Sequence, residues 1–132
     1  MFLGHYFLEA VGEERGHAQK LLDYLIQRGG IPTFPVISGI EKPADLGSPL
    51  EMLNKALDLE KQVNESLLNL CKIAEKDQDY QLGDYLESEF LSEQVESIKE
   101  LSDMITRLGI CGGEGLGLFV WDESLNPSAS PC

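Results

Sequence analysis

Polar side chains interrupt the apolar stripes of three predicted helices, and their chemical types suit a metal ion. Glu14 and His17 lie in the first stripe, Glu60 in the second and Gln94 in the third. Because residues three positions apart share a helix face, the Glu14 carboxylate and the His17 imidazole can converge on one ion. A carboxylate with an imidazole suits iron or manganese better than calcium, which takes oxygen ligands. The sequence therefore predicts a transition-metal site between helices.

Each of these residues also has a purely structural interpretation. A single histidine on an apolar face is more often a core residue with a satisfied hydrogen bond, and a single glutamate can tilt out towards water. The three-residue spacing of Glu14 and His17 is a weak signal by itself, because it often arises by chance. However, Glu14 and Glu60 both lie near the middle of a helix, and an unpaired buried carboxylate is costly. Their joint occurrence at similar depths of one bundle favours the metal site.

The elements that must position these residues are helical nearly throughout, because apolar residues recur at spacings of three and four. Gly29-Gly30 ends the first helix, and Ser48-Pro49 with Glu51 in the first turn begins the second. The predicted elements are helices at about 1–28, 48–76, 79–108 and 114–123, a long connection at about 29–47 and a frayed tail at 126–132.

The connections indicate an all-α bundle that forms a single domain over 1–132. The 29–47 segment contains three prolines, which block a helix there, and its length suits a crossover between two parallel helices. The polar turn at 77–79 is short, so the helices on either side of it should be antiparallel. Three long amphipathic helices leave one face of a four-helix bundle uncovered. We therefore expect a fourth helix, or a partner in its place, on that face.

The composition excludes several classes of protein. Apolar residues make up 42% of the chain, and 10 Lys and Arg against 23 Asp and Glu give a net charge of −13. Such a chain repels nucleic-acid phosphates and anionic lipids and attracts cations, so neither nucleic acid nor membrane is expected as a partner. Cys71, Cys111 and Cys132 form no CxxC pair and no even framework. This pattern argues against structural zinc and a disulfide scaffold, and it favours reduced thiols in the cytoplasm.

Longer segments of the chain resemble the eukaryotic ferritin subunits, in particular those of the heavy-chain type. Residues 13–22 (EERGHAQKLL) with 27–30 (QRGG) are similar to the second ferritin helix, and residues 56–64 (ALDLEKQVN) are similar to the third. Residues 84–101 (with DYLE, FLSEQV and IKEL) are similar to the fourth helix, and residues 115–125 to the fifth. The resemblance implies a ferritin-like four-helix bundle with a long crossover loop and a short fifth helix. The family's first helix is missing from this chain.

The resemblance also implies an iron-storage subunit of a hollow, twenty-four-subunit shell, homo- or hetero-oligomeric. In such subunits a di-iron ferroxidase centre oxidises Fe(II) to Fe(III) with O₂ or peroxide, and the product is stored as mineral. By this resemblance Glu14 bridges the two irons, His17 binds one and Glu60 binds the other. Gln94 holds water or oxidant beside them, and Glu13 passes iron onward.

Asp84 and Glu87 form a separate pair of acids on one face of the third predicted helix. In ferritins the matching carboxylates meet their symmetry copies around a threefold axis and line a cation channel, so the resemblance implies this role here. Without the resemblance, the better interpretation is two surface acids that complement a helix N-terminus.

Two other functions stay open. The family's first helix supplies a further iron-binding glutamate, so a non-catalytic structural ferritin-like subunit that co-assembles with complete subunits is the second hypothesis. The third is an acidic helical adaptor whose uncovered face binds a partner helix without metal. Consumption of O₂ during Fe(II) titration separates the first from the second, and the absence of any bound metal would favour the third.

Overall fold

A computed structural model describes residues 1–37 and 46–128 of the chain, and every regular element within them is helical. The elements are α1 (Phe2–Gln27), α2 (Pro49–Lys76), α3 (Tyr80–Leu86), the π-helical turn η2 (Glu87–Leu91), α4 (Ser92–Cys111) and α5 (Gly115–Glu123). The all-α prediction is confirmed. Residues 38–45 of the predicted connection and 129–132 of the predicted tail lie outside the described residues.

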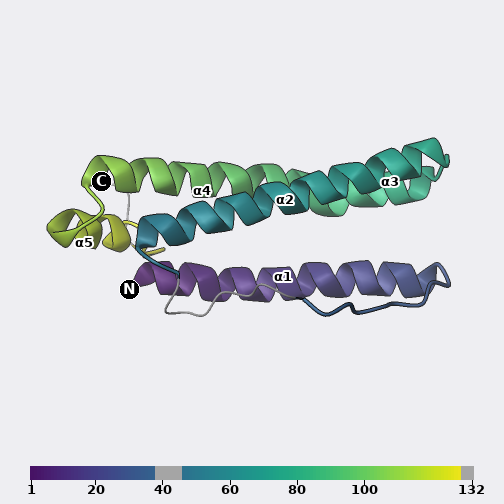
Figure 1. The fold of residues 1–132 in the computed structure, drawn as a ribbon, viewed down its shortest axis with the longest axis horizontal. Helices are drawn as coiled ribbons and strands as arrows, with labels where there is room; N and C mark the ends of the chain where they lie inside the picture. The colour runs from purple at the N-terminus through teal and green to yellow at the C-terminus, as the bar shows by residue number, and fades with distance from the viewer. Residues whose placement is uncertain (38–45, 129–132) are drawn as a thin grey trace.

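The long helices lie side by side as rods (Figure 1). α1 and α2 begin at the same end of the molecule and run in parallel, which requires the long connection between them. α3, η2 and α4 form one continuous rod that returns antiparallel to α2, and α5 folds back beside the starts of α1 and α2. This is the arrangement that the ferritin-like prediction requires.

The start of α2 is set by local chemistry. The Ser48 hydroxyl accepts a hydrogen bond from the Glu51 amide at 3.3 Å, and the Ser48 amide donates to the Glu51 carboxylate at 2.6 Å. Pro49 occupies the first helical position, where its missing N–H costs nothing. Gly47 precedes this cap with a φ of +80°, and a Cβ there would lie 2.3 Å from Glu51 Oε2. The glycine is therefore required by both its backbone and its neighbour.

Two apolar clusters form the core, with a polar layer between them. The cluster beside α5 contains the buried side chains of Leu3, Leu53, Leu101, Met104, Leu108 and Trp121. The cluster at the α3 end contains those of Leu67, Leu86 and Phe90. Glu60 lies between the clusters along α2, and Gln94 lies between them along the returning rod. The fold thus places the predicted polar residues midway along the bundle.

The third predicted helix differs from the observed one, because a π-helical turn interrupts it. Leu86, Phe90 and Gln94 are all buried at four-residue spacing. In a regular α-helix each step of four residues rotates the side chain about 40° away from the first. The wider turn at Glu87–Leu91 keeps all three on the inner face, and such turns are frequent at functional sites.

Candidate metal centre

The predicted pair on α1 shares one face of the helix. Nδ1 of His17 lies 3.6 Å from Oε1 of Glu14, with the His17 side chain more buried than that of Glu14. Because α1 is a regular helix through this region, the three-residue spacing produces the proximity directly. A cation between these two atoms would have one imidazole and one carboxylate ligand.

Glu60 and Gln94 form the second predicted pair, across α2 and α4. The Gln94 Nε2 group donates to Glu60 Oε2 at 3.0 Å and to the Glu60 carbonyl oxygen at 3.1 Å. Gln94 is only 4% exposed, so these bonds fix the orientation of a buried amide. The amide holds one carboxylate oxygen of Glu60 in place and leaves the other for a ligand.

The two carboxylates from different helices face one space. Glu14 and Glu60 both line an apolar groove between α1 and α2, together with Tyr6, Phe7 and Leu59. Two carboxylates that line one groove attract a cation between them by Coulomb's law. The structure therefore brings Glu14 and Glu60 to one groove, and His17 lies beside Glu14 but lines the neighbouring groove between α1 and α4.

Glu93 is a neighbour of this region that the sequence reasoning assigned no role. Its Oε2 lies 2.6 Å from Nε2 of His17, so the ring contacts one carboxylate through each nitrogen. Two carboxylates on opposite edges of one ring do not converge on a single point. Accordingly, no three His, Cys, Asp or Glu side chains among residues 1–37 and 46–128 are close enough together to hold a metal ion.

The donor set nevertheless fits iron. With a metal at Nδ1, on the Glu14 side, the Nε2–H group of His17 would donate to Glu93. Metal-binding histidines commonly donate their other N–H to a carboxylate, which fixes the tautomer and raises the basicity of the ligand. The only sequence signal for Glu93 was its position beside the inward-facing Gln94.

Tyr6 reports the electrostatic potential of this region and was also missed by the sequence reasoning. Its half-buried phenol lines the same groove as Glu14 and Glu60. Burial raises its pKa to about 12, with further contributions from Glu100, Glu60 and Glu13. These carboxylates therefore add negative potential around the Tyr6 phenol.

Comparison with known proteins identifies the family. The sequence model of the family described as the ferritin-like domain matches residues 3–110 of this chain. The soma ferritin of Lymnaea stagnalis is 47% identical over 127 residues, which cover 95% of this chain and 71% of the relative. This chain belongs to the ferritin family. The chloroplastic ferritin-1 of Brassica napus is 45% identical over 126 residues, covering 93% of this chain and 49% of the relative. The ferritin of Pacifastacus leniusculus is 42% identical over 128 residues, covering 96% and 69%.

The chain spans about half the length of the chloroplastic ferritin and about seven-tenths of the snail one. None of the helices in its described residues is long and apolar enough to cross a membrane.

The remaining predicted ferritin residues lie outside the α1–α2 groove. Glu13 lines a second, more polar groove between α1 and α4, together with His17 and Glu93. Asp84 in α3 and Glu87 in η2 are exposed to solvent. α3 lies at the end of the bundle opposite α5 (Figure 1). Burial and the nearby Glu87 carboxylate raise the pKa of the Cys71 thiol. Neither acid lines the groove that contains Glu14 and Glu60.

Proposed function

We propose that this ferritin chain stores iron and that it oxidises Fe(II) to Fe(III) at a di-iron centre formed by Glu14, His17 and Glu60. The observation that carries this proposal is that Glu14 and Glu60, from two helices, line one groove, with His17 Nδ1 on the side of Glu14. The three donors come from the residue types that bind iron in proteins.

Each residue has a role that its contacts support. Glu14 lies beside His17 and shares a groove with Glu60, so it would bridge the two ions, while His17 binds one ion and Glu60 the other. Gln94 restrains Glu60 and orients water or oxidant, and Glu93 holds the His17 ring. Anionic ligands stabilise Fe(III) more than Fe(II), so they draw the oxidation forward. Two Fe(II) ions give up one electron each, and O₂ takes up both with two protons to form hydrogen peroxide.

The route of iron and its storage follow from the acidic residues outside the centre. Asp84 and Glu87 attract Fe(II) at the entrance of a channel formed by symmetry-related copies, since rings of acids concentrate divalent cations. Glu13, in the groove beside His17, passes oxidised iron onward to mineral inside a twenty-four-subunit shell. We place this function in the cytoplasm, where the thiols stay reduced.

The test compares Fe(II) oxidation by the full chain and by the double variant His17→Ala, Glu60→Ala. Stopped-flow absorbance of the ferric product and O₂ consumption give the initial rate, which we expect to fall by at least tenfold. The matched control is His5→Ala, Glu65→Ala, which removes the same residue types from exposed positions of the same two helices. An unchanged initial rate in the first variant would reject the proposed centre.

A non-catalytic ferritin-like subunit is the second candidate. The observation in its favour is that two predicted ligands already contact side chains that are not predicted ligands, His17 with Glu93 and Glu60 with Gln94. Such a chain would offer an acidic surface within a mixed shell. Binding of Fe(II) without consumption of O₂ would favour this function over the ferroxidase.

A further inference from the structure

α1 carries Glu14 and His17, yet apolar packing holds this helix only weakly within the described residues. Leu3 is the one buried residue among its 26. Leu8 and Val11 are 69% and 48% exposed, and Leu25 and Ile26 near the other end are 41% and 54% exposed. Within the described residues, polar contacts therefore join α1 to the rest of the fold, both near its middle, at His17 and Lys20, and at its two ends.

The first anchor is Asp122 of α5, a carboxylate only 7% exposed. Its Oδ2 accepts a hydrogen bond from the Phe2 amide and its Oδ1 from the Leu3 amide, both at 2.9 Å. These amides lie in the first turn of α1, where the helix supplies no acceptor and its own cap residue Met1 offers none. The negative charge also complements the positive end of the helix. Because both carboxylate oxygens accept a hydrogen bond, Asp122 fixes the direction of α1 and the position of its first turn relative to α5.

α5 transmits this restraint to α4. Trp121, next to Asp122, is almost completely buried, and its indole N–H donates to the Met104 carbonyl oxygen at 3.2 Å. The start of α1 is thus joined through α5 to the rod that carries Gln94.

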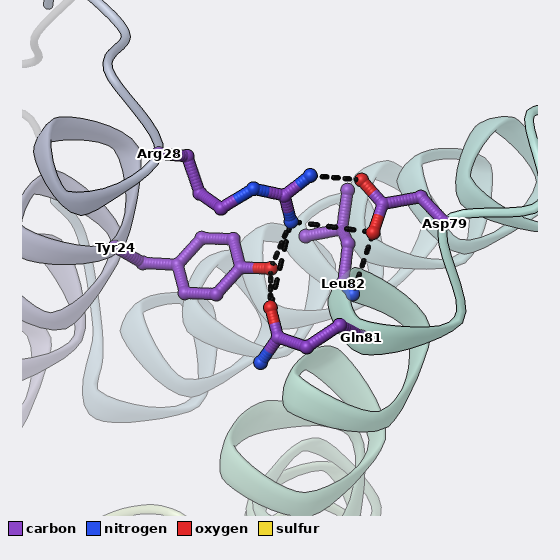
Figure 2. Close-up of polar contacts among 5 residues, drawn as sticks. All are labelled: Tyr24, Arg28, Asp79, Gln81 and Leu82. Carbon is purple, nitrogen blue, oxygen red and sulfur yellow. Dashed lines mark hydrogen bonds and ion pairs between the residues drawn. The ribbon is translucent and has the colours of Figure 1, made fainter.

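The second anchor joins the end of α1 to the start of α3 (Figure 2). The Arg28 guanidinium forms two hydrogen bonds with Asp79, Nη2 to Oδ2 at 2.7 Å and Nη1 to Oδ1 at 3.2 Å. Asp79 also caps α3 by accepting from the Leu82 amide at 3.1 Å. Arg28 Nη1 donates to the Tyr24 hydroxyl at 2.7 Å, and this hydroxyl donates to Gln81. A bidentate pair of this kind is directional as well as attractive.

Aromatic stacking strengthens the second anchor. The ring of Tyr24 lies parallel to that of Tyr85, with the centroids 4.3 Å apart. The Tyr85 hydroxyl donates to the Lys20 carbonyl oxygen of α1 at 3.1 Å. The last two turns of α1 are therefore tied to α3 by an ion pair, a stacked pair and a hydrogen bond.

The candidate metal centre lies midway between the anchors. Glu14 lies 11 positions after Leu3 at the first anchor, and His17 lies 11 positions before Arg28 at the second. Each separation is about 16 Å along the helix. The contacts of α1 near its middle, His17 with Glu93 and Lys20 with Glu89, face α4 and η2. Glu14, on the same face as His17, lines the adjoining apolar groove together with Glu60. The width of this groove depends on the tilt of α1, which the ends restrain.

We propose that Asp122 and the Arg28–Asp79 pair are positioning residues that set the separation of Glu14 and Glu60. The geometric part of this inference stands on the contacts above, and only its metal readout rests on the proposed function. Release of one anchor lets α1 tilt about its remaining contacts, so the groove widens and a pair of ions no longer fits both carboxylates.

A distance measurement tests the geometric part in the full chain. Spin labels are placed on exposed positions of α1 and α2 through Gln19→Cys and Glu65→Cys, with the three native cysteines replaced by serine. Labelled chains are mixed with excess unlabelled chain, so that each assembly carries one pair. We expect a narrow distance distribution in this parent and a broader or longer one after Asp122→Ala or Arg28→Gln. The milder variant Asp79→Asn keeps the α3 cap but removes the charge, and it should also broaden the distribution.

Metal binding is measured as the dissociation constant for Co(II), from the visible absorption of the bound ion. This absorption should be absent in His17→Ala. We expect at least tenfold weaker binding in the anchor variants, and no change in the control Lys99→Gln, which removes an ion pair within α4. Unchanged distances and unchanged Co(II) affinity in the anchor variants would overturn the inference while leaving the ferroxidase intact. If the anchors move the distance but the parent does not oxidise Fe(II), the proposed function fails and the positioning inference holds.

Discussion

Nε2 of His17 lies 2.6 Å from Oε2 of Glu93, so a residue of the returning rod fixes the imidazole that α1 presents to the candidate centre. Glu93→Gln keeps an acceptor for the ring N–H but removes the negative charge. Loss of such a partner typically weakens metal binding by about 10–100-fold. We expect a loss of this size in anaerobic Fe(II) titration, against little change for Glu96→Gln, another exposed acid of α4. Equal Fe(II) affinities in Glu93→Gln and Glu96→Gln would show that Glu93 does not support metal binding by His17.

The second anchor predicts a dependence of stability on pH. Hydrogen bonds from Arg28 and from the Leu82 amide lower the pKa of Asp79 below its usual value of 3.8. A carboxyl with a lowered pKa in the folded state stabilises the fold above the usual value, and this stabilisation is lost as the pH falls through the lowered one. The melting temperature of Asp79→Asn should therefore lie below that of the parent at neutral pH. The difference should shrink progressively below about pH 4.

Circular dichroism melts from neutral pH to about pH 2 measure this difference. The control is Asp77→Asn, in the same turn. A constant difference across the range would show that the Asp79 charge does not contribute to the anchor.

Two glycine substitutions should have opposite effects on stability. Gly47→Ala would place a Cβ 2.3 Å from Glu51 Oε2 at a φ of +80°, so it disrupts the cap of α2. Loss of the cap and the strained backbone together should lower the free energy of unfolding by about 1–3 kcal/mol. Gly12 lies within α1 with open space around it, so Gly12→Ala should raise the free energy by about 0.5–1 kcal/mol. Denaturant melts give both values, and a stabilising Gly47→Ala would contradict the structural account of the cap.

The acidic pair at the α3 end should control the entry of iron. Asp84→Asn with Glu87→Gln removes two exposed charges and leaves Glu14, His17 and Glu60 in place. We expect the rate of Fe(II) uptake to fall severalfold, with the difference from the parent shrinking at high salt because screening weakens long-range attraction. Glu75→Gln with Asp77→Asn, two exposed acids at the end of α2, is the matched control. Equal uptake by the two double variants at low salt would rule out the proposed channel role.

Features that depend on nearby residues were predictable from the sequence, whereas those that depend on tertiary contacts were not. The α2 cap at Ser48 and Glu51 and the proximity of Glu14 and His17 follow from spacings of three residues. The inward orientation of Gln94 followed from its apolar stripe.

The π-helical turn has no local signal, because it arises from the need to bury three side chains at four-residue spacing on one face. The role of Glu93 depends on the register after this turn and was therefore missed. Asp122 was missed for a similar reason, since its partners Phe2 and Leu3 lie about 120 positions away in the chain.

Anomalous diffraction at the iron edge, from crystals soaked anaerobically in Fe(II), tests whether Glu14, His17 and Glu60 hold iron. We expect one peak between the Glu14 carboxylate and Nδ1 of His17, and a second between Glu14 and Glu60. Both peaks should disappear in the His17→Ala, Glu60→Ala variant. Iron found only at surface acids such as Asp84 and Glu87, with none in the groove between α1 and α2, would contradict the account.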